Sequence, residues 1–244
     1  LAVAELNGDQ QLDLLGTGSD GIRIIQNTIT IDPLTFELSS ALAVTGILPM
    51  PAPVDSLVVD DFDKDGRTDL LVSAGVGVLL RGAGNATFLE SAFLDPAPVS
   101  IIVAGDVNGD GWLDAITPGA SGLSVHINPA GIPPTNWTGI PLLTGGPVLD
   151  LAVTEVDGNP AHVDDIVIIQ DSSDPLVLIR RLSQELGDSE VVPLPFEGDP
   201  SEARLLLVDT DGDNGTDVLV RQEDNSATSL AVYRSLAVVD EQQS

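Results

Sequence analysis

Hydrophobic residues along the chain occur in short runs, and turn residues separate one run from the next. In residues 53–97 the runs are SLVV, DLLV, GVGVLLRG and TFLESAF. Short runs of this kind, bounded by Gly, Pro, Asn and Asp, are typical of β-strands joined in a meander. The same order of four runs occurs five times, which predicts repeats at residues 1–52, 53–97, 98–146, 147–199 and 200–244.

Prolines mark the boundaries of these repeats. Pro53, Pro98, Pro147 and Pro200 are spaced 45, 49 and 53 residues apart. Proline cannot donate a hydrogen bond to a β-ladder, so we expect each one at the start of a strand or in the connection before it. A period of this length is too long for helical repeats and suits a four-stranded blade. We therefore predict an all-β fold, a β-propeller of antiparallel blades, with residues 1–244 as a single domain.

The inner runs favour a propeller over a sandwich. Residues 70–72 and 166–169 are continuously apolar, as expected of strands that neighbouring sheets cover on both faces. A two-sheet sandwich would leave one face of each strand exposed. Radially stacked blades account for these runs, and five blades are visible. The pattern leaves open whether they close a five-bladed ring or form part of a larger one.

A candidate metal loop lies between the first two runs of the second repeat, in VVDDFDKDGRTDLLV at residues 58–72. Carboxylates at alternate positions of a tight turn converge on one point, and Gly66 supplies backbone freedom where the chain bends. Such a set of oxygen ligands favours a hard cation, and calcium fits best because it accepts many carboxylates in flexible geometry. We call residues 61–69 the second loop and predict calcium bound by Asp61, Asp63, Asp65 and Asp69.

Related loops occur at the same place in the other four repeats. The third loop (106–114) and the fifth loop (209–217) are complete copies, and they supply Asp106, Asn108, Asp110 and Asp114, and Asp209, Asp211, Asp213 and Asp217. The first loop (5–13) begins with Glu5, has Gln10 in place of the glycine, and supplies a further predicted site from Glu5, Asn7, Asp9 and Asp13. The fourth loop (155–165) has two extra residues and contains Pro160, so we expect it to bind weakly or to be empty.

Two other interpretations of the loops can be weighed. An EF-hand needs a bidentate Glu at position twelve and helices on both sides. Position twelve is Val72, Thr117 or Val220 here, and the flanking runs are short and β-branched, which disfavours an EF-hand. An acidic hairpin turn that binds nothing is the second alternative, because Asp, Asn and Gly are ordinary turn residues. Three complete copies at matching places favour a metal site.

The pattern of an apolar strand, D-x-[DN]-x-D-G-x-x-D and a second apolar strand resembles the FG-GAP or VCBS-type repeats of the integrin α-subunit β-propeller and its bacterial relatives. The resemblance covers essentially the whole chain. It implies that each loop joins the first and second strands of a blade and that the acidic and Asn side chains named above in the second, third and fifth loops hold calcium. It also implies that backbone carbonyls complete the three full sites, from Arg67, Trp112 and Gly215. The integrin-type ring has seven blades, whereas five repeats are visible here.

The charge of the chain restricts its partners. The 38 acidic residues against 9 basic ones give a formal charge of −29, which repels nucleic acid and anionic membranes. Cysteine is absent, and no apolar run is long enough to predict insertion into a membrane. The chain opens at Leu1 inside a strand-like run, as expected of a processed or excised piece. We expect an extracellular, secreted or cell-surface protein.

Few residues suit catalysis. His126 lies in a predicted third strand and His162 in the fourth loop, and structural roles are favoured for both. We therefore predict a calcium-stabilised binding or scaffold module for a protein or glycan ligand, and no enzyme. A polysaccharide lyase or hydrolase, or an accessory domain of one, is the first alternative. A lectin is the second, although the aromatic content of 3% counts against sugar binding.

Overall fold

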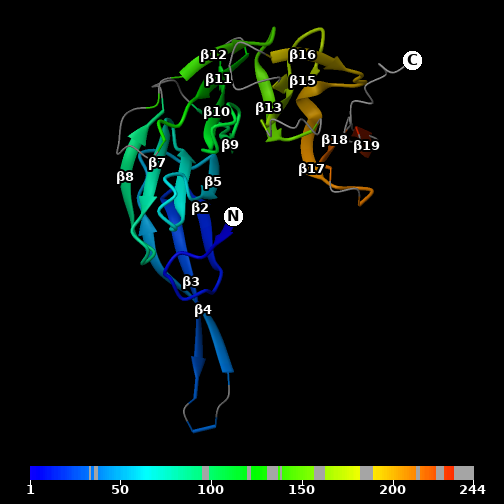
Figure 1. Ribbon diagram of the computed structural model, residues 1–244. Coiled ribbons are helices and arrows are strands. Elements are labelled where there is room, and N and C mark those ends of the chain that lie inside the picture. The colour runs from blue at the N-terminus through cyan, green and yellow to red at the C-terminus, as the bar shows by residue number, and fades with distance from the viewer. Residues whose placement is uncertain are drawn as a thin grey trace, which may run out of the picture. The chain divides into compact units, whose positions relative to one another are not determined.

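The computed structural model describes residues 1–32, 34–35, 38–94, 99–119, 122–130, 137, 139–156, 163–181, 189–212, 215–223 and 228–233. Its strands form five antiparallel sheets, and each sheet lies within one of the repeats expected from the sequence (Figure 1). The all-β fold is therefore confirmed. Within the described residues the only helical segment is a short 3-10 helix, η1 (Pro200–Glu202). None of the described helical segments has the length and apolar character needed to cross a membrane.

Each sheet follows the order of its strands in the chain, with neighbours paired antiparallel. The first sheet contains β1 (Ala2–Ala4), β2 (Asp13–Gly18), β3 (Gly21–Ile31) and β4 (Leu38–Leu48). The second contains β5 (Ser56–Asp60), β6 (Asp69–Ser73), β7 (Gly77–Gly82) and β8 (Phe88–Phe93). The third contains β9 (Val103–Gly105), β10 (Asp114–Gly119), β11 (Gly122–His126) and β12 (Gly139–Leu143).

The fourth sheet contains β13 (Val148–Thr154), β14 (Asp165–Gln170), β15 (Leu176–Arg181) and β16 (Ser189–Leu194). The fifth has three described strands, β17 (Ala203–Val208), β18 (Asp217–Glu223) and β19 (Thr228–Tyr233). Its predicted fourth strand, in residues 235–240, lies outside the described residues. Contacts divide the chain into two compact units, residues 1–102 with 128–139 and residues 103–127 with 140–244. The prediction of a single domain stays a prediction.

In the first unit, the first and second sheets bury their apolar faces against each other. Leu15 and Ile22 of the first sheet belong to one core with Leu70 and Val72 of the second. All five residues of β6 are buried, because its two faces are both covered. A continuous apolar run therefore forms a strand that is covered on both faces, as the sequence predicts.

In the second unit, the fourth and fifth sheets share a core. Val167 and Ile169 of β14 pack with Ala203, Val218 and Val220 of the fifth sheet. All six residues of β14 are buried. In contrast, β17 alternates, since Ala203 is fully buried and Leu206 is 52% exposed. One face of β17 is thus more covered than the other, whereas residues 217–220 of β18 are all buried.

The first sheet departs from the sequence prediction at its outer edge. The predicted fourth run, TFELSS, ends at residue 40, whereas β4 continues to Leu48 and pairs with β3 from Ile22 to Ile31. Because β2 pairs only with residues 21–25 of β3, the rest of β3 and β4 forms a two-stranded ribbon that extends beyond the sheet (Figure 1).

Candidate metal centre

Each loop predicted from the sequence connects the first and second strands of a sheet. The second loop follows β5 and leads into β6, the third lies between β9 and β10, and the fifth lies between β17 and β18. The first loop connects β1 and β2 in the same way. The loops therefore lie at the same place in each sheet, as the repeat pattern requires.

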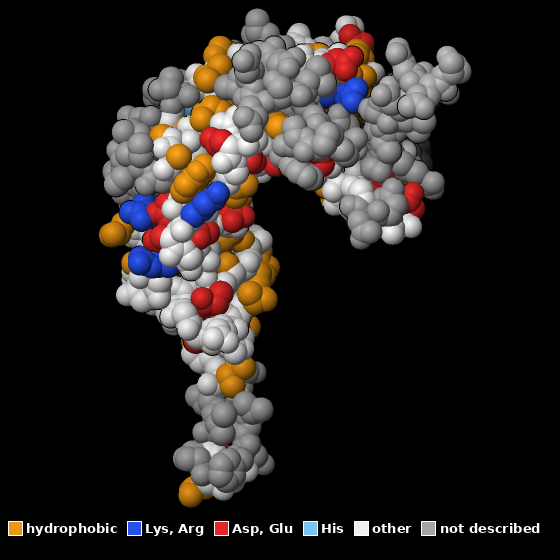
Figure 2. Space-filling view, in the orientation of Figure 1, with side chains coloured by type: hydrophobic (Ala, Val, Ile, Leu, Met, Phe, Trp, Pro, Cys, Tyr) orange, Lys and Arg blue, Asp and Glu red, His pale blue; other side chains and the backbone are white. Residues whose placement is uncertain are grey.

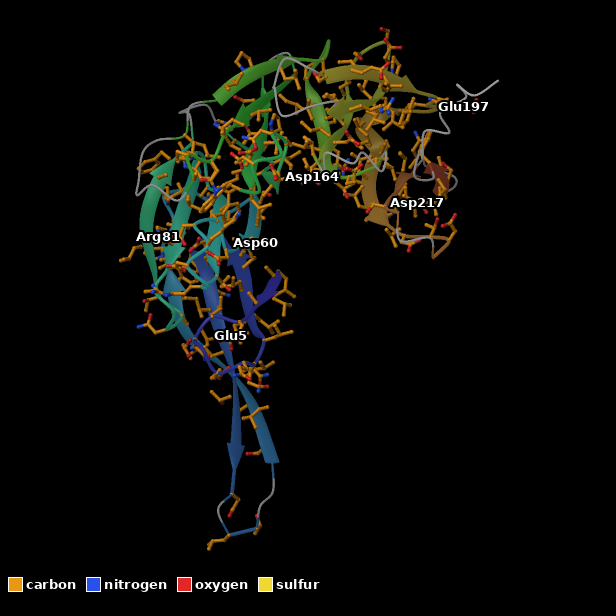
Figure 3. All side chains as sticks on the ribbon, viewed as in Figure 1. Glu5, Asp60, Arg81, Asp164, Glu197 and Asp217 are labelled. Carbon is orange, nitrogen blue, oxygen red and sulfur yellow. The ribbon has the colours of Figure 1, made fainter. Side chains whose placement is uncertain are left out.

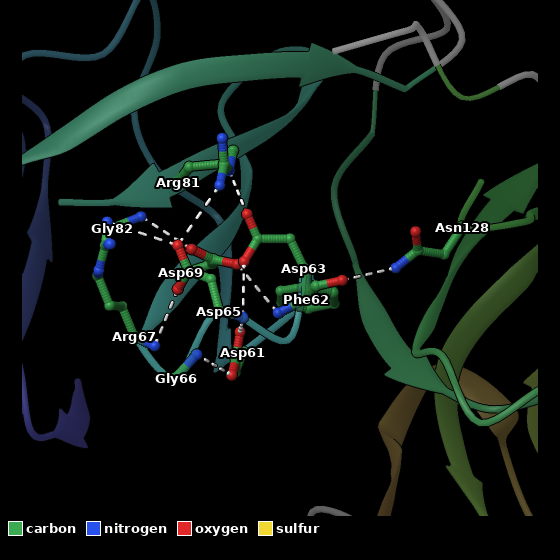
Figure 4. Close-up of polar contacts among 10 residues, drawn as sticks. All are labelled: Asp61, Phe62, Asp63, Asp65, Gly66, Arg67, Asp69, Arg81, Gly82 and Asn128. Atoms are coloured by element: carbon green, nitrogen blue, oxygen red, sulfur yellow. Dashed lines mark hydrogen bonds and ion pairs between the residues drawn. The ribbon is translucent and has the colours of Figure 1, made fainter. Parts of the chain in front are cut away.

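The second loop is held by its own side chains. Asp61 accepts hydrogen bonds from the backbone N–H groups of Asp65 (3.1 Å) and Gly66 (2.8 Å), and Asp63 accepts one from Asp65 (3.2 Å) (Figure 4). Asp65 in turn accepts from the N–H of Arg67 at 3.0 Å. These bonds turn the three carboxylates toward one another, so that one oxygen of each lies within 4.8 Å of the others. Such a group of oxygens can hold a hard divalent cation.

The third loop repeats this scaffold. Asp106 accepts from the N–H groups of Asp110 (3.1 Å) and Gly111 (2.7 Å), and Asn108 accepts from Asp110 at 2.9 Å. Asp110 accepts from the N–H of Trp112 at 2.8 Å. The equivalent bonds of the second loop have nearly the same lengths. The asparagine at the third position therefore does not change the turn, and its carbonyl oxygen takes the place of one carboxylate oxygen.

The first loop is also held by its own side chains, with a longer acid at the first position. Glu5 accepts from the N–H groups of Asn7 (2.9 Å), Gly8 (2.5 Å) and Asp9 (3.2 Å), and Asn7 accepts from Asp9 at 3.0 Å. Asp9 accepts from the N–H of Gln11 at 2.8 Å. Glu5 thus bonds to the third, fourth and fifth residues of its loop, whereas the first-position aspartates of the second and third loops bond to the fifth and sixth.

The last two loops are described in part. In the fifth loop, oxygens of Asp209, Asp211 and Asp217 lie within 4.8 Å of one another, and Asp209 accepts from the N–H of Gly212 at 2.6 Å. Asp213 lies outside the described residues, whereas Gly215 is described and partly buried. Residues 157–162 of the fourth loop, including His162, also lie outside them.

Two positions in each of the first three loops adopt a left-handed backbone. The sixth position has φ of +83° at Gly66 and +82° at Gly111, and the fourth position has φ of +70° at Gly109. Glycine adopts this region without the clash that a Cβ causes. Gln10, which replaces the sixth-position glycine in the first loop, has φ of +65°, and Lys64 has φ of +55° at the fourth position of the second. The first and second loops therefore carry local backbone strain.

The last residue of each loop, the ninth in the loops of nine residues, has a structural role besides the metal-ligand role that the sequence predicts for four of the five. Asp13, Asp69, Asp114, Asp165 and Asp217 begin the second strand of each sheet and are fully buried. Asp69 accepts from the N–H groups of Phe62 (3.0 Å) in its own loop and Gly82 (2.8 Å) in the third strand. Asp13 accepts from the N–H of Asn27 at 2.8 Å, and Asp217 from that of Thr210 at 2.9 Å. This aspartate therefore accepts hydrogen bonds that connect the loop to the strands of its sheet. The signal for the role is present in the sequence, because even the degenerate fourth loop keeps Asp165.

Burial also changes the acidity of this position. Loss of hydration raises the pKa of Asp69 to about 6, and the nearby charges of Asp63 and Asp61 act in the same direction. The two backbone hydrogen bonds from Gly82 and Phe62 act against the rise. A divalent cation beside these acids would favour the ionised form.

Side chains link some loops to a neighbouring sheet. The Thr68 hydroxyl donates to the backbone carbonyl of Glu5 at 2.7 Å in the first unit. In the second unit, Asp164 accepts from the N–H of Asp106 at 2.8 Å, and its own N–H donates to the Asp106 carbonyl at 2.9 Å. Burial, and secondarily the Asp106 charge, raises the pKa of Asp164. The eighth position of a loop thus contacts the loop of the sheet beside it.

A polar cavity of about 690 Å³ lies in the first unit, between the first and second loops. Its lining includes Glu5 and Asp60, which lie at the ends of β1 and β5, together with Asp61, Arg67 and Thr68 (Figure 3). The space-filling view shows acidic and basic side chains together over the β5–β8 sheet (Figure 2). Charged and hydroxyl groups of this kind suit a polar ligand.

The candidate histidine and the two tryptophans lie in different surroundings. His126 is 1% exposed, and its Nε2 lies 3.0 Å from the Thr117 hydroxyl of the adjacent strand. Trp137 is buried against Phe62 with the ring centroids 6.5 Å apart, and Trp112 is partly buried.

Comparisons with known proteins agree with this architecture. Residues 61–117 match the family model of the FG-GAP-like repeat. An Agrocybe aegerita lectin, described for its recognition of non-reducing terminal N-acetylglucosamine, has a similar structure with a TM-score of 0.62 at 15% identity. That match covers 92% of this chain and 62% of the lectin chain.

The Photorhabdus luminescens Tc holotoxin pore is also similar, with a TM-score of 0.50 at 14% identity, over 97% of this chain and 11% of that one. This chain therefore spans less than two thirds of either protein. No curated protein sequence matches it. At these identities the two structures show the fold alone. The five sheets and the similar structures show a β-propeller fold whose sheets are the blades, and residues 61–117 match an FG-GAP-like repeat.

Proposed function

We propose that this propeller is a calcium-stabilised, non-catalytic binding module that acts outside the cell. The observation that carries the proposal is the second loop, where three carboxylates converge within 4.8 Å on a turn that their own hydrogen bonds hold. Oxygen donors without sulfur or imidazole fit calcium and fit softer metals poorly. The third loop has the same scaffold, and the fifth loop has a second cluster of three carboxylates.

Each proposed ion would be held by the side chains at positions one, three and five, with the backbone carbonyl of the seventh residue. In the second loop these groups are Asp61, Asp63, Asp65 and the carbonyl of Arg67. The ninth-position aspartate, which the sequence also predicts as a ligand, would complete the set, since Asp217 belongs to the carboxylate cluster of the fifth loop. The bound ion would neutralise like charges and hold the strands of its blade. An extracellular site with a dissociation constant of about 0.1–1 mM would contribute about 0.4–1.4 kcal/mol at about 1 mM calcium. Three or four such sites would be a sizeable part of the stability of a domain.

The ligand that we propose is a glycan or a protein with a polar surface. The cavity beside the first and second loops would receive it, since the carboxylates of Glu5, Asp60 and Asp61 can accept hydrogen bonds from hydroxyl groups and Arg67 can donate them. The lectin with a similar structure favours a glycan. A glycan array tests this choice: retention of defined glycans supports it, and loss of that retention in Asp60→Ala links it to the cavity. Binding to proteins alone would favour the protein ligand.

Thermal melting tests the role of calcium. We expect the melting midpoint to rise by several degrees when calcium replaces a chelator, and magnesium to have a smaller effect because it demands a tighter octahedral site. Equal midpoints in calcium and chelator would contradict the proposal. Turnover of any member of a panel of acidic and neutral polysaccharides would instead favour the enzyme alternative.

A further inference from the structure

Arg81 lies beside the second loop and pairs with two of its carboxylates. Its Nε donates to Asp63, and its Nη2 lies 3.4 Å from an oxygen of Asp65 (Figure 4). The Asp63 side chain is 11% exposed, so this pair is better shielded from solvent than an ordinary surface ion pair. A cation of the protein itself therefore lies against two of the groups that would hold calcium.

The strand register identifies the equivalent of Arg81 in every blade. In the second blade, Leu70 comes directly after the ninth loop residue, Asp69, and pairs with Leu80 of the third strand. Arg81 is the residue after Leu80. The same count leads to one residue in each of the other blades: Gln26, Ile127, Arg180 and Arg234. Arg234 lies outside the described residues and is placed only by its sequence position. Three of the nine basic residues in the chain thus occupy one repeat position.

This position varies together with the third position of the loop. The three blades with arginine have aspartate at the third loop position, namely Asp63, Asp157 and Asp211. The two blades with a neutral residue have asparagine there, Asn7 beside Gln26 and Asn108 beside Ile127. Each additional carboxylate is therefore accompanied by one additional guanidinium.

The consequence is a constant charge. In the first and third loops, positions one, three and five carry two carboxylates and one amide. In the second and fifth loops they carry three carboxylates, and the arginine offsets one of them. Counted over positions one, three and five and the arginine position alone, each of these four loops carries −2. This count leaves out the ninth-position aspartate, which all four loops share, and Arg67, whose Nη1 lies 3.5 Å from an oxygen of Asp65. In the degenerate fourth loop the same positions give −1 from Glu155, Asp157 and Arg180 by sequence alone, and Arg180 lies 3.2 Å from Glu190.

We propose that Arg81 is a charge-compensating residue that pairs with the third-position Asp63 and sets the calcium affinity of the second loop. This inference rests on the proposed calcium function. Arg81 lowers the affinity of the second loop, because the ion must share Asp63 and Asp65 with a guanidinium and is repelled by its charge. In the absence of calcium, the same guanidinium relieves the repulsion among the three carboxylates.

The test is a set of substitutions in the complete chain, with calcium titrations followed by calorimetry. Asp61→Asn identifies the binding component of the second loop as the component that disappears. Arg81→Met keeps the aliphatic stem, and we expect it to raise the affinity of that component by about threefold to tenfold. Asp63→Asn leaves a net charge of −1 and is expected to lower the affinity by about tenfold. The double variant restores −2 and should return close to the unsubstituted affinity.

Arg23→Met is the matched control, because Arg23 is an exposed arginine that pairs with Asp20 at 2.9 Å and lies outside the loops. It removes the same charge from the chain and should leave the second loop unchanged. An Arg81→Met affinity equal to or below that of the unsubstituted protein would overturn the proposal. The proposal would also be overturned if the effects of Arg81→Met and Asp63→Asn on calcium affinity were independent, so that the double variant did not recover the unsubstituted affinity.

Melting in chelator separates this proposal from the calcium function. Without metal, Asp63→Asn and Arg81→Met should each shift the midpoint, and the double variant should shift it by less than the sum, because the two side chains form one pair. Additive shifts would overturn the charge pair whether or not calcium binds. If the pair is coupled but the unsubstituted protein binds no calcium, the proposed calcium function fails, and with it the role of Arg81 in affinity.

Discussion

The left-handed sixth position of the loops gives a sharp test of local structure. Gly66 has φ of +83°, and a Cβ at this position would meet no heavy atom within 4 Å. Gly66→Ala would therefore introduce backbone strain without a steric clash, which costs about 1–2 kcal/mol for an L-residue in this region. The lower entropy of the unfolded alanine variant recovers about 0.4–1 kcal/mol. We expect a net loss of about 1 kcal/mol, or about 2–4 °C in melting midpoint.

The first loop allows the reverse experiment. Gln10 already has φ of +65° at the sixth position, so Gln10→Gly should relieve strain and stabilise the protein by about 0.5–1 kcal/mol. Gly16→Ala is the control, because Gly16 lies in β2 with an ordinary φ, and the methyl group of an alanine there would have no heavy atom within 4 Å. Alanine at this position should stabilise the protein by about 0.5–1 kcal/mol.

Urea unfolding in chelator measures these differences without a contribution from calcium. The expected order of stability has Gln10→Gly and Gly16→Ala above the unsubstituted protein and Gly66→Ala below it. If Gly66→Ala were neutral or stabilising, as Gly16→Ala is expected to be, the left-handed geometry assigned to the loop would be refuted.

Three further predictions concern the contacts around the loops. Thr68→Val removes the hydroxyl that donates to Glu5 and should cost about 1 kcal/mol in urea unfolding, whereas a loss below about 0.3 kcal/mol would show that this link between blades is unimportant. The pKa of Asp69 is raised to about 6 in the folded state, so its contribution to stability is greatest below its unfolded pKa and declines as the pH rises to about 6. The free energy of unfolding of the unsubstituted protein minus that of Asp69→Asn, measured in chelator as a function of pH, should show this decline. A difference that does not change with pH would contradict it. Asp165→Ala should destabilise the fourth blade by about 1–3 kcal/mol, because it leaves the buried N–H of Val156 without its acceptor; an unchanged midpoint would refute the tying role of the ninth position.

The sequence predicts the blades well because their signals are local. Short apolar runs such as residues 166–169 correspond to a strand, β14, that is buried throughout. The D-x-[DN]-x-D-G pattern predicts the turn, since the carboxylates of Asp61 and Asp106 bond to nearby N–H groups of their own loops. In these cases, the residues that determine the strand or the turn lie within a few positions of one another in the sequence.

Other features depend on contacts between distant segments. The length of β4 follows from its pairing with β3 and not from the run TFELSS. The bond from Gly82 to Asp69 spans thirteen residues, and the pairing of Arg81 with Asp63 spans eighteen. Sequence spacing alone cannot reveal such contacts, because the strand register brings the partners together. Once the register is known, the variation of arginine with the third loop position can be seen in the sequence.

The central claim is that the repeated loops each bind one calcium ion, and calorimetric titration of the complete protein tests it most directly. We predict three or four calcium ions per chain, with Asp61→Asn, Asp106→Asn and Asp209→Asn each removing one. Absence of calcium binding, or a stoichiometry that these substitutions leave unchanged, would contradict the account.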